Sequence, residues 1–253
     1  MSDAPTIVVT GGNRGIGRAV AHLAAEEGNR VVVVARGGPV AGVETVVGDL
    51  SSARTTRAAA DALATVCPRI DVLVHNAGIW PSRLVRNEDG FEQAFFTNHL
   101  APFLLNHRLE ARLGRVVQVS AGLYVKGVVD PERTPIGADF HPLRTYANTK
   151  LANLLMLPLF AERWRASGVT IDAVHPGVIR TGLGDRGGPL GLLLKAVKRT
   201  WRSPEEGARP VVRLLRATGT GRYFHETSEA PLALDTDLAR RLWTDAARAL
   251  DVA

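Results

Sequence analysis

The chain has 253 residues, of which 45% are hydrophobic and 22% charged, and its formal net charge is +6. This balance predicts a soluble globular protein with one α/β domain over residues 1–253, and the single cysteine, Cys67, excludes a disulfide framework. The arginines are scattered and form no basic block interleaved with aromatic residues, so we expect no nucleic-acid partner.

Short β-branched runs alternate with Ala- and Leu-rich helical stretches along the chain. The predicted strands are residues 6–10, 30–35, 45–47, 70–74, 115–119, 169–174 and 222–224. Strands separated by helices form parallel βαβ units, whose right-handed crossovers cover both faces of a sheet. We therefore predict a doubly wound Rossmann fold with a parallel seven-stranded sheet, helices on both faces, and a ligand at the carboxyl ends of the strands.

The first predicted strand leads into a glycine-rich turn, which in turn opens an Ala-rich helical stretch. In this setting, backbone N–H groups and the positive end of the helix can meet a pyrophosphate, and glycines allow its close approach. The turn predicts a dinucleotide site that includes Gly11, Asn13, Arg14, Gly15, Ile16 and Gly17.

Two arginines indicate which dinucleotide binds. Folds that bind NAD often carry an acidic residue at the end of the second strand, whereas this chain has Arg36 there and Arg14 inside the glycine turn. Two guanidinium groups that face one ribose match a 2′-phosphate through charge and forked hydrogen bonds. We predict NADP(H) as the cofactor; the alternative is that both arginines are simply exposed.

Polar and glycine residues follow nearly every predicted strand. These segments are residues 10–11, 35–36, 48–50, 75–78, 120–122 and 175–177. Because the carboxyl ends of parallel strands meet at one rim, a shared site explains this recurrence better than a separate turn at each strand.

A Tyr–Lys pair supplies candidate chemistry. The four-residue spacing of Tyr146 and Lys150 places both on one face of a helix, where the ammonium can lower the pKa of the phenol. Alone, such a pair is usually a solvated face. Together with a dinucleotide site it predicts the proton-transfer device of a redox enzyme, in which Lys150 and the positive ring of the oxidised cofactor bring the phenol toward working pH.

Two later segments complete the predicted domain. Ser203-Pro204-Glu205-Glu206 predicts an N-cap, a first-turn proline and a capping glutamate for a helix that ends near Arg216. Residues 181–202 are rich in glycine and lead into three leucines, which favours a substrate lid. An ordinary surface loop with a short helix stays open as the alternative.

These motifs, in this order, resemble the short-chain dehydrogenase/reductase superfamily across nearly the whole chain. The resemblance rests on the turn 10–17, Asn76-Ala77-Gly78, Asn98, the Ser120 region, Tyr146-x-x-x-Lys150 and Pro176-Gly177. The run 146–153, its long gap from Ser120 and the tail 221–243 resemble the retinol-dehydrogenase-like and protochlorophyllide-reductase-like branch.

The resemblance implies an NADPH-dependent ketone or aldehyde reductase that acts reversibly on a lipophilic small molecule. Tyr146 would protonate the carbonyl oxygen, Lys150 would hold the nicotinamide ribose, and Asn98 would anchor a water that relays protons through Lys150. The implied cofactor contacts are Asp49 and Leu50 beside the adenine, Asn76, Ala77 and Gly78 along the ribose, and Pro176, Gly177, Val178 and Thr181 toward the nicotinamide.

One position departs from the family pattern. Members usually carry two consecutive serines after the fifth strand, and the second bonds the substrate oxygen, but this chain has Ser120-Ala121. Loss of one oxyanion donor costs roughly 10²–10³ in rate, so Ser120 replaces it, another group substitutes, or carbonyl reduction is weak. We favour Ser120 as a catalytic residue. The alternative is an NADP(H)-binding protein with lost or redirected redox activity, either a sensor or a non-redox enzyme.

Further expectations concern partners and location. The segment 98–115 is shorter than in the relatives it resembles, where it helps to form the dimer face, so a homodimer and a homotetramer both stay open. The histidines show no metal-ligand spacing, and we expect metal-free catalysis. No apolar run reaches the roughly 20 residues that span a bilayer, and residues 1–5 lack a secretory pattern, so we expect a cytoplasmic protein without membrane attachment.

Overall fold

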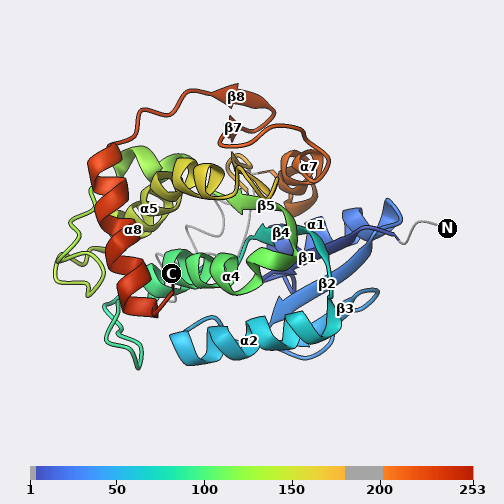
Figure 1. The fold of residues 1–253 in the computed structure, drawn as a ribbon, viewed down its shortest axis with the longest axis horizontal. Helices are drawn as coiled ribbons and strands as arrows, with labels where there is room; N and C mark the ends of the chain where they lie inside the picture. Colours follow the sequence, from blue (N-terminus) through green and yellow to red (C-terminus); the bar gives the residue numbers. More distant parts are fainter. Residues whose placement is uncertain (1–3, 180–201, 253) are drawn as a thin grey trace, which may run out of the picture.

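The computed structural model describes residues 4–179 and 202–252. Its centre is an eight-stranded sheet with the order β3-β2-β1-β4-β5-β6-β7-β8 (Figure 1). The strands are β1 (Thr6–Thr10), β2 (Arg30–Ala35), β3 (Glu44–Val47), β4 (Ile70–His75), β5 (Leu113–Val119), β6 (Thr170–His175), β7 (Tyr223–His225) and β8 (Ser228–Ala230). Strands β1 to β7 pair in parallel, and β8 runs antiparallel to β7.

The predicted doubly wound fold is confirmed, and each of the seven predicted strands forms within two residues of its expected bounds. The eighth strand was not predicted. It is a three-residue edge strand with two exposed residues, joined to β7 by a turn in which Glu226 has φ +55°. Hairpin turns with a positive φ usually contain Gly or Asn, and the sequence Glu226-Thr227 therefore did not predict a hairpin.

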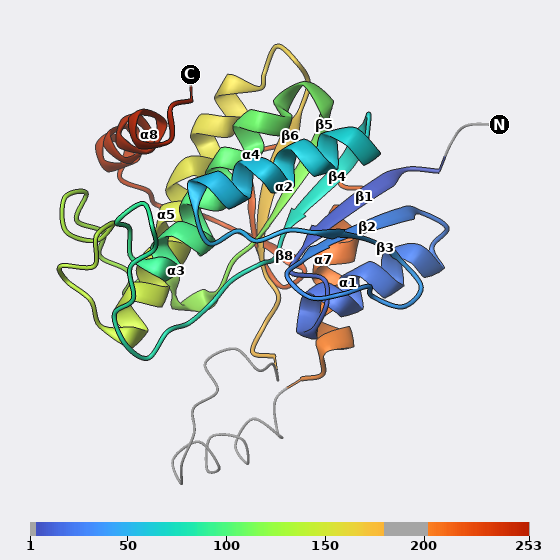
Figure 2. The same ribbon diagram turned by 90° about the horizontal axis from the view of Figure 1, so that it is seen from below.

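Helices cover both faces of the sheet. Helices α1 (Gly15–Glu26) and α7 (Pro204–Leu214) pack on one face, and α2 (Ala53–Val66), α4 (Ala101–Leu109) and α5 (Pro142–Arg163) pack on the other. Helix α8 (Thr236–Leu250) lies on the outer side of α5 (Figures 1 and 2). Alternate residues of β1 and β2 enter the two cores: Val9 and Val33 face α1, whereas Val8 and Val32 face the opposite layer. A strand buried on both faces therefore reads as a continuous apolar run.

Shorter helical segments complete the fold, namely α3 (Gln93–Phe95), the π-helical turn η1 (Phe96–Leu100), and the 3₁₀ turns η2 (Glu110–Arg112) and η3 (Gly122–Lys126). The predicted capping box at the start of α7 is present, because Ser203 and Glu206 each bond the other's backbone N–H. The helix ends at Leu214, two residues before its predicted end. Within the described ranges, no helix is long and apolar enough to cross a bilayer.

Two buried histidines bond asparagines between secondary-structure elements. His75 Nε2 lies 2.8 Å from Asn106 Oδ1, and His99 Nδ1 lies 3.0 Å from Asn153 Oδ1. Burial lowers the pKa of each imidazole from its ordinary 6.5 to about 4. This pairing is consistent with a structural role for His75.

The protein should lose stability as the pH falls from about 6.5 toward 4, because the unfolded chain binds protons at His75 and His99 before the folded protein does. Below about pH 4 both states are protonated at these sites, and the two histidines add no further loss. Thermal unfolding across this range should show a shallower decline for His75→Gln than for the unmodified chain. An equal slope would contradict the assignment.

Candidate active site

A pocket of about 970 Å³ opens at the carboxyl ends of the central strands, beside the boundary between β1 and β4 where the order of successive strands across the sheet reverses. The predicted site residues that line it are Gly11, Asn13, Arg14, Gly15, Ile16, Arg36, Asp49, Leu50, Asn76, Ala77, Gly78, Ser120, Tyr146, Lys150, Pro176, Gly177 and Val178. Gly17 and Asn98 are buried outside this lining. Thr181 and residues 181–201 of the predicted lid lie outside the described residues.

The glycine turn is tied closely to β4. Asn76 Nδ2 donates to the main-chain oxygens of Thr10 at 3.0 Å and Gly11 at 3.2 Å. A Cβ at Gly17 would lie 2.2 Å from Asn76 Nδ2 and 2.5 Å from the oxygen of Gly11, so only glycine fits there. Gly11 itself has φ +66°. At Gly11 and Gly15 the turn presents backbone without a side chain to the pocket, directly before α1, and this arrangement fits a bound pyrophosphate.

Arg14 and Arg36 both line this pocket with exposed side chains. Neither guanidinium group has an ion pair or hydrogen bond within residues 4–179 and 202–252. Unpaired guanidinium groups beside a nucleotide cradle fit an additional phosphate on that nucleotide.

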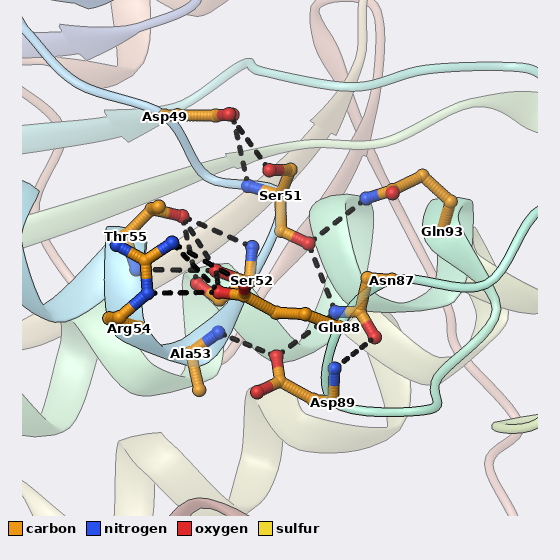
Figure 3. Close-up of polar contacts among 10 residues, drawn as sticks. All are labelled: Asp49, Ser51, Ser52, Ala53, Arg54, Thr55, Asn87, Glu88, Asp89 and Gln93. Carbon is orange, nitrogen blue, oxygen red and sulfur yellow. Dashed lines mark hydrogen bonds and ion pairs between the residues drawn. The ribbon is translucent and has the colours of Figure 1, made fainter.

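The third strand ends in a braced corner beside these arginines. Asp49 accepts hydrogen bonds from the Ser51 backbone N–H at 3.1 Å and from Ser51 Oγ at 2.8 Å (Figure 3). The main-chain oxygen of Ser51 in turn accepts from Asn87 Nδ2 and from Gln93 Nε2, each at 3.0 Å. The corner thus joins the nucleotide end of the pocket to the segment that follows β4.

Helix α5 carries Tyr146 and Lys150, which are 6% and 5% exposed. Lys150 Nζ donates to the main-chain oxygen of Val119 at 3.0 Å and lies 5.6 Å from the centroid of the Tyr146 ring. Burial lowers the pKa of Lys150 to about 8 and raises the pKa of Tyr146 well above its ordinary value. Burial alone accounts for this raised pKa, and the expected lowering by Lys150 together with the oxidised cofactor stays a prediction. The phenol is protonated at neutral pH and can act as a proton donor.

Asn98 lies in the π-helical turn η1, a feature frequent at functional sites. Its Oδ1 accepts from the Ile79 N–H at 2.8 Å, and its Nδ2 donates to the Ile79 oxygen at 2.9 Å and to Thr149 Oγ1 at 3.1 Å. Both Nδ2 hydrogens are thus used within the protein. The side chain holds the pocket wall at Ile79 against α5, next to Lys150.

Two buried polar groups at the pocket have no protein partner in the described part of the chain. They are Ser120 Oγ and His175 Nδ1, and both residues line the pocket. A buried hydroxyl without a partner is costly, and a ligand oxygen would satisfy it. Burial lowers the pKa of His175 to about 4, so this imidazole is neutral at neutral pH. His175 was not predicted as a site residue, although its place directly before Pro176-Gly177 was a usable signal.

A second residue that the sequence did not single out is Trp80. Its indole stacks on the Tyr146 ring, with 4.6 Å between centroids and 9° between planes. The only local signal was an aromatic residue two positions after Asn76-Ala77-Gly78.

A doubly wound sheet, a glycine cradle and a buried Tyr–Lys pair at one pocket define a dinucleotide-dependent oxidoreductase. Residues 5–187 match the family model described as short chain dehydrogenase, and the chain belongs to the short-chain dehydrogenase/reductase family. Retinol dehydrogenase 14 of Homo sapiens is 33% identical, over 94% of this chain and 84% of that protein.

Two further similarities cover most of the chain. A provisionally named daunorubicin C-13 ketoreductase, DnrU of Streptomyces sp. (strain C5), is 32% identical over 97% of this chain and 92% of its own. The crystal structure of a short chain dehydrogenase from Burkholderia cenocepacia J2315 in complex with NADP has the same fold, with a TM-score of 0.70. Its sequence is 22% identical, over 88% of this chain and 96% of its own.

Proposed function

We propose that this protein is an NADPH-dependent oxidoreductase that interconverts a carbonyl and an alcohol on a lipophilic small molecule. The observation that carries the proposal is the buried Tyr146–Lys150 pair in the same pocket as the glycine cradle. Family membership supports a nicotinamide cofactor. Relatives named for retinol and for a daunorubicin ketone support an apolar substrate with an alcohol or carbonyl group.

In the proposed reaction, NADPH supplies the hydride to the carbonyl carbon. Tyr146, which burial keeps protonated, donates its proton to the carbonyl oxygen and takes a proton back in the reverse direction. Lys150, held by the Val119 oxygen, contacts the nicotinamide ribose and stabilises the charge left on the phenol. Ser120 Oγ donates a hydrogen bond to the substrate oxygen in place of the serine missing at Ala121. Asn98 positions the pocket wall at Ile79 against Thr149 of α5, next to Tyr146 and Lys150.

The remaining cofactor contacts follow chain order, from the turn after β1 to the segment after β6. Gly11, Gly15 and Gly17 let the pyrophosphate approach the turn, with Asn13 and Ile16 beside it; Arg14 and Arg36 receive the 2′-phosphate; Asp49 and Leu50 flank the adenine; Asn76, Ala77 and Gly78 lie along the ribose; and Pro176, Gly177 and Val178 lie toward the nicotinamide. The nicotinamide contact expected of Thr181 is proposed from the sequence alone, since this residue lies outside the described ranges.

Arg36→Asp should weaken NADPH binding by about 10- to 100-fold and shift preference toward NADH, since a charged hydrogen bond contributes roughly 1.5–3 kcal/mol. Dissociation constants for both nucleotides, measured by fluorescence titration, check this result. Arg83→Asp is the matched control, because Arg83 is exposed, makes the same charge change and does not line the pocket. An unchanged NADPH-to-NADH ratio in Arg36→Asp would remove the basis for NADP(H).

The second candidate is an NADP(H)-binding protein with lost or redirected redox activity, which Ala121 favours. The two candidates separate when nucleotide binding is measured first and absorbance of the reduced nicotinamide is then followed with apolar ketones, aldehydes and quinones. Turnover supports the reductase. Tight NADPH binding without turnover on any carbonyl supports the second candidate, and failure to bind either nucleotide contradicts both.

A further inference from the structure

Trp80 covers one face of the Tyr146 ring. The two rings are nearly parallel, with 4.6 Å between their centroids. Trp80 Nε1 donates to the main-chain oxygen of Pro142, at the start of α5, at 2.8 Å. The indole is only partly buried, and it lines the pocket. Its single hydrogen-bond donor is therefore used within the protein, and the part of the ring that remains accessible is apolar π-surface.

The segment that carries Trp80 is braced along its length. At its beginning, Ile79 is held by Asn98 through both backbone groups. Farther along, Arg86 Nε donates to the Ile136 oxygen at 2.8 Å. At its end, the turn 87–89 is bonded to the start of α2, where Asp89 accepts from the Ala53 N–H and Glu88 accepts from Ser52 Oγ (Figure 3).

Trp80 forms part of the surface that a substrate meets beside the phenol. The hydroxyl of Tyr146 lies at the edge of its ring, and the indole covers one of the two ring faces next to it. The group attached to the carbonyl carbon then lies beside Trp80, in a pocket whose nearby walls include Ile79 and Leu123. Aromatic rings in offset or edge-to-face contact gain about 0.5–1.5 kcal/mol beyond the burial of their area, and a puckered saturated ring does not.

We propose that Trp80 is a specificity-determining residue that selects planar, conjugated carbonyl substrates, such as aryl aldehydes and aryl ketones, over saturated ones of similar size. The proposal rests on the proposed carbonyl–alcohol function and adds the substrate class. The reaction is the transfer of one hydride from NADPH to the carbonyl carbon and one proton from Tyr146 to its oxygen, giving the alcohol and NADP⁺. Tyr146 regains its proton from solvent.

Benzaldehyde and cyclohexanecarboxaldehyde form a matched pair, because they share a carbon skeleton and differ in ring planarity. Trp80→Leu should lower the ratio of kcat/KM for benzaldehyde over the cyclohexyl aldehyde by about 3- to 10-fold, mainly through a higher KM for benzaldehyde. Trp80→Phe keeps an aromatic ring but loses the bond to Pro142, and it should retain most of the ratio. Val85→Ala, an exposed change on the same segment outside the pocket lining, should leave the ratio unchanged.

The readout separates selection from a general structural role. A ratio that stays constant in Trp80→Leu, or an equal loss of kcat/KM for both aldehydes, would overturn the proposal while leaving the reductase function standing. The NADPH dissociation constant and melting temperature of each variant show whether the pocket still folds. If Trp80→Leu does not fold, Trp80→Phe still tests the proposal, because a large fall of the ratio in a variant that keeps an aromatic ring would contradict it.

A binding test covers the case in which the unmodified protein reduces neither aldehyde, which would count against the proposed function alone. Calorimetry with NADP⁺ present would compare 2-acetylnaphthalene with its decahydro analogue. Preferential binding of the planar ketone that falls about 3- to 10-fold in Trp80→Leu supports the role of Trp80. Equal binding of both ketones to the unmodified protein contradicts it.

Discussion

Tyr146→Phe should lower kcat for carbonyl reduction by about 10²- to 10⁴-fold while NADPH still binds, since general acid catalysis contributes gains of that size. The ring that stacks on Trp80 is kept and only the hydroxyl is removed. Burial raises the pKa of that hydroxyl, so it holds its proton at neutral pH until the oxygen of the substrate takes it. Steady-state rates with one aldehyde, together with a nucleotide titration, measure the two effects separately.

A second phenol provides the control for Tyr146. Tyr124 packs edge-on against Tyr223 and does not line the pocket, so Tyr124→Phe removes a hydroxyl outside the proposed machinery. It should leave kcat within about twofold, because the removed hydroxyl lies outside the pocket lining and away from the proposed chemistry. If Tyr146→Phe retained a comparable rate, the proposed acid would have to lie elsewhere.

Asp172→Ala should destabilise the fold by about 3–5 kcal/mol, because it would leave buried positive charge without its partner. Asp172 is fully buried in β6, pairs with Arg115, and accepts from Arg222 Nη2 at 2.8 Å and from the Arg222 N–H at 2.8 Å. Burial lowers the pKa of Arg115, and the nearby Asp172 carboxylate opposes that shift. The free energy of unfolding from urea titration measures the loss.

An exposed ion pair is the control for Asp172. Glu162 and Arg165 pair on the surface near the end of α5, where solvent screens the attraction. Glu162→Ala should change the free energy of unfolding by less than about 1 kcal/mol. A similarly small loss for Asp172→Ala would mean that the two arginines find other partners when the carboxylate is removed.

Most of the fold could be predicted because its strands are buried on both faces. The run Val31-Val32-Val33-Val34 is readable as a central parallel strand without any knowledge of its neighbours. The pocket followed from the same reasoning, since the carboxyl ends of parallel strands meet at one rim and the glycine and polar residues stand there. Strand β8 could not be predicted, because it is short and exposed and begins after a turn without Gly or Asn.

The site details that escaped prediction depend on contacts between distant segments. Trp80 meets Tyr146 only because the segment after β4 is braced against α2 and the residues before α5, and no periodicity encodes that path. The direction of the Tyr146 pKa shift depends on how deeply the helix face is buried, which four-residue spacing does not reveal. The unpartnered Ser120 Oγ likewise emerges only once β5 and β6 are packed side by side.

The central claim is hydride transfer from NADPH to a carbonyl carbon in this pocket. In the most direct measurement, the protein is incubated with an aryl aldehyde and NADPH that carries two deuterium atoms at C4 of the nicotinamide ring. The alcohol product is then analysed by mass spectrometry. One deuterium on the carbinol carbon is the expected result, with a rate that collapses in Tyr146→Phe. A protein that binds NADPH but yields no deuterated alcohol from any aldehyde or ketone would contradict the claim.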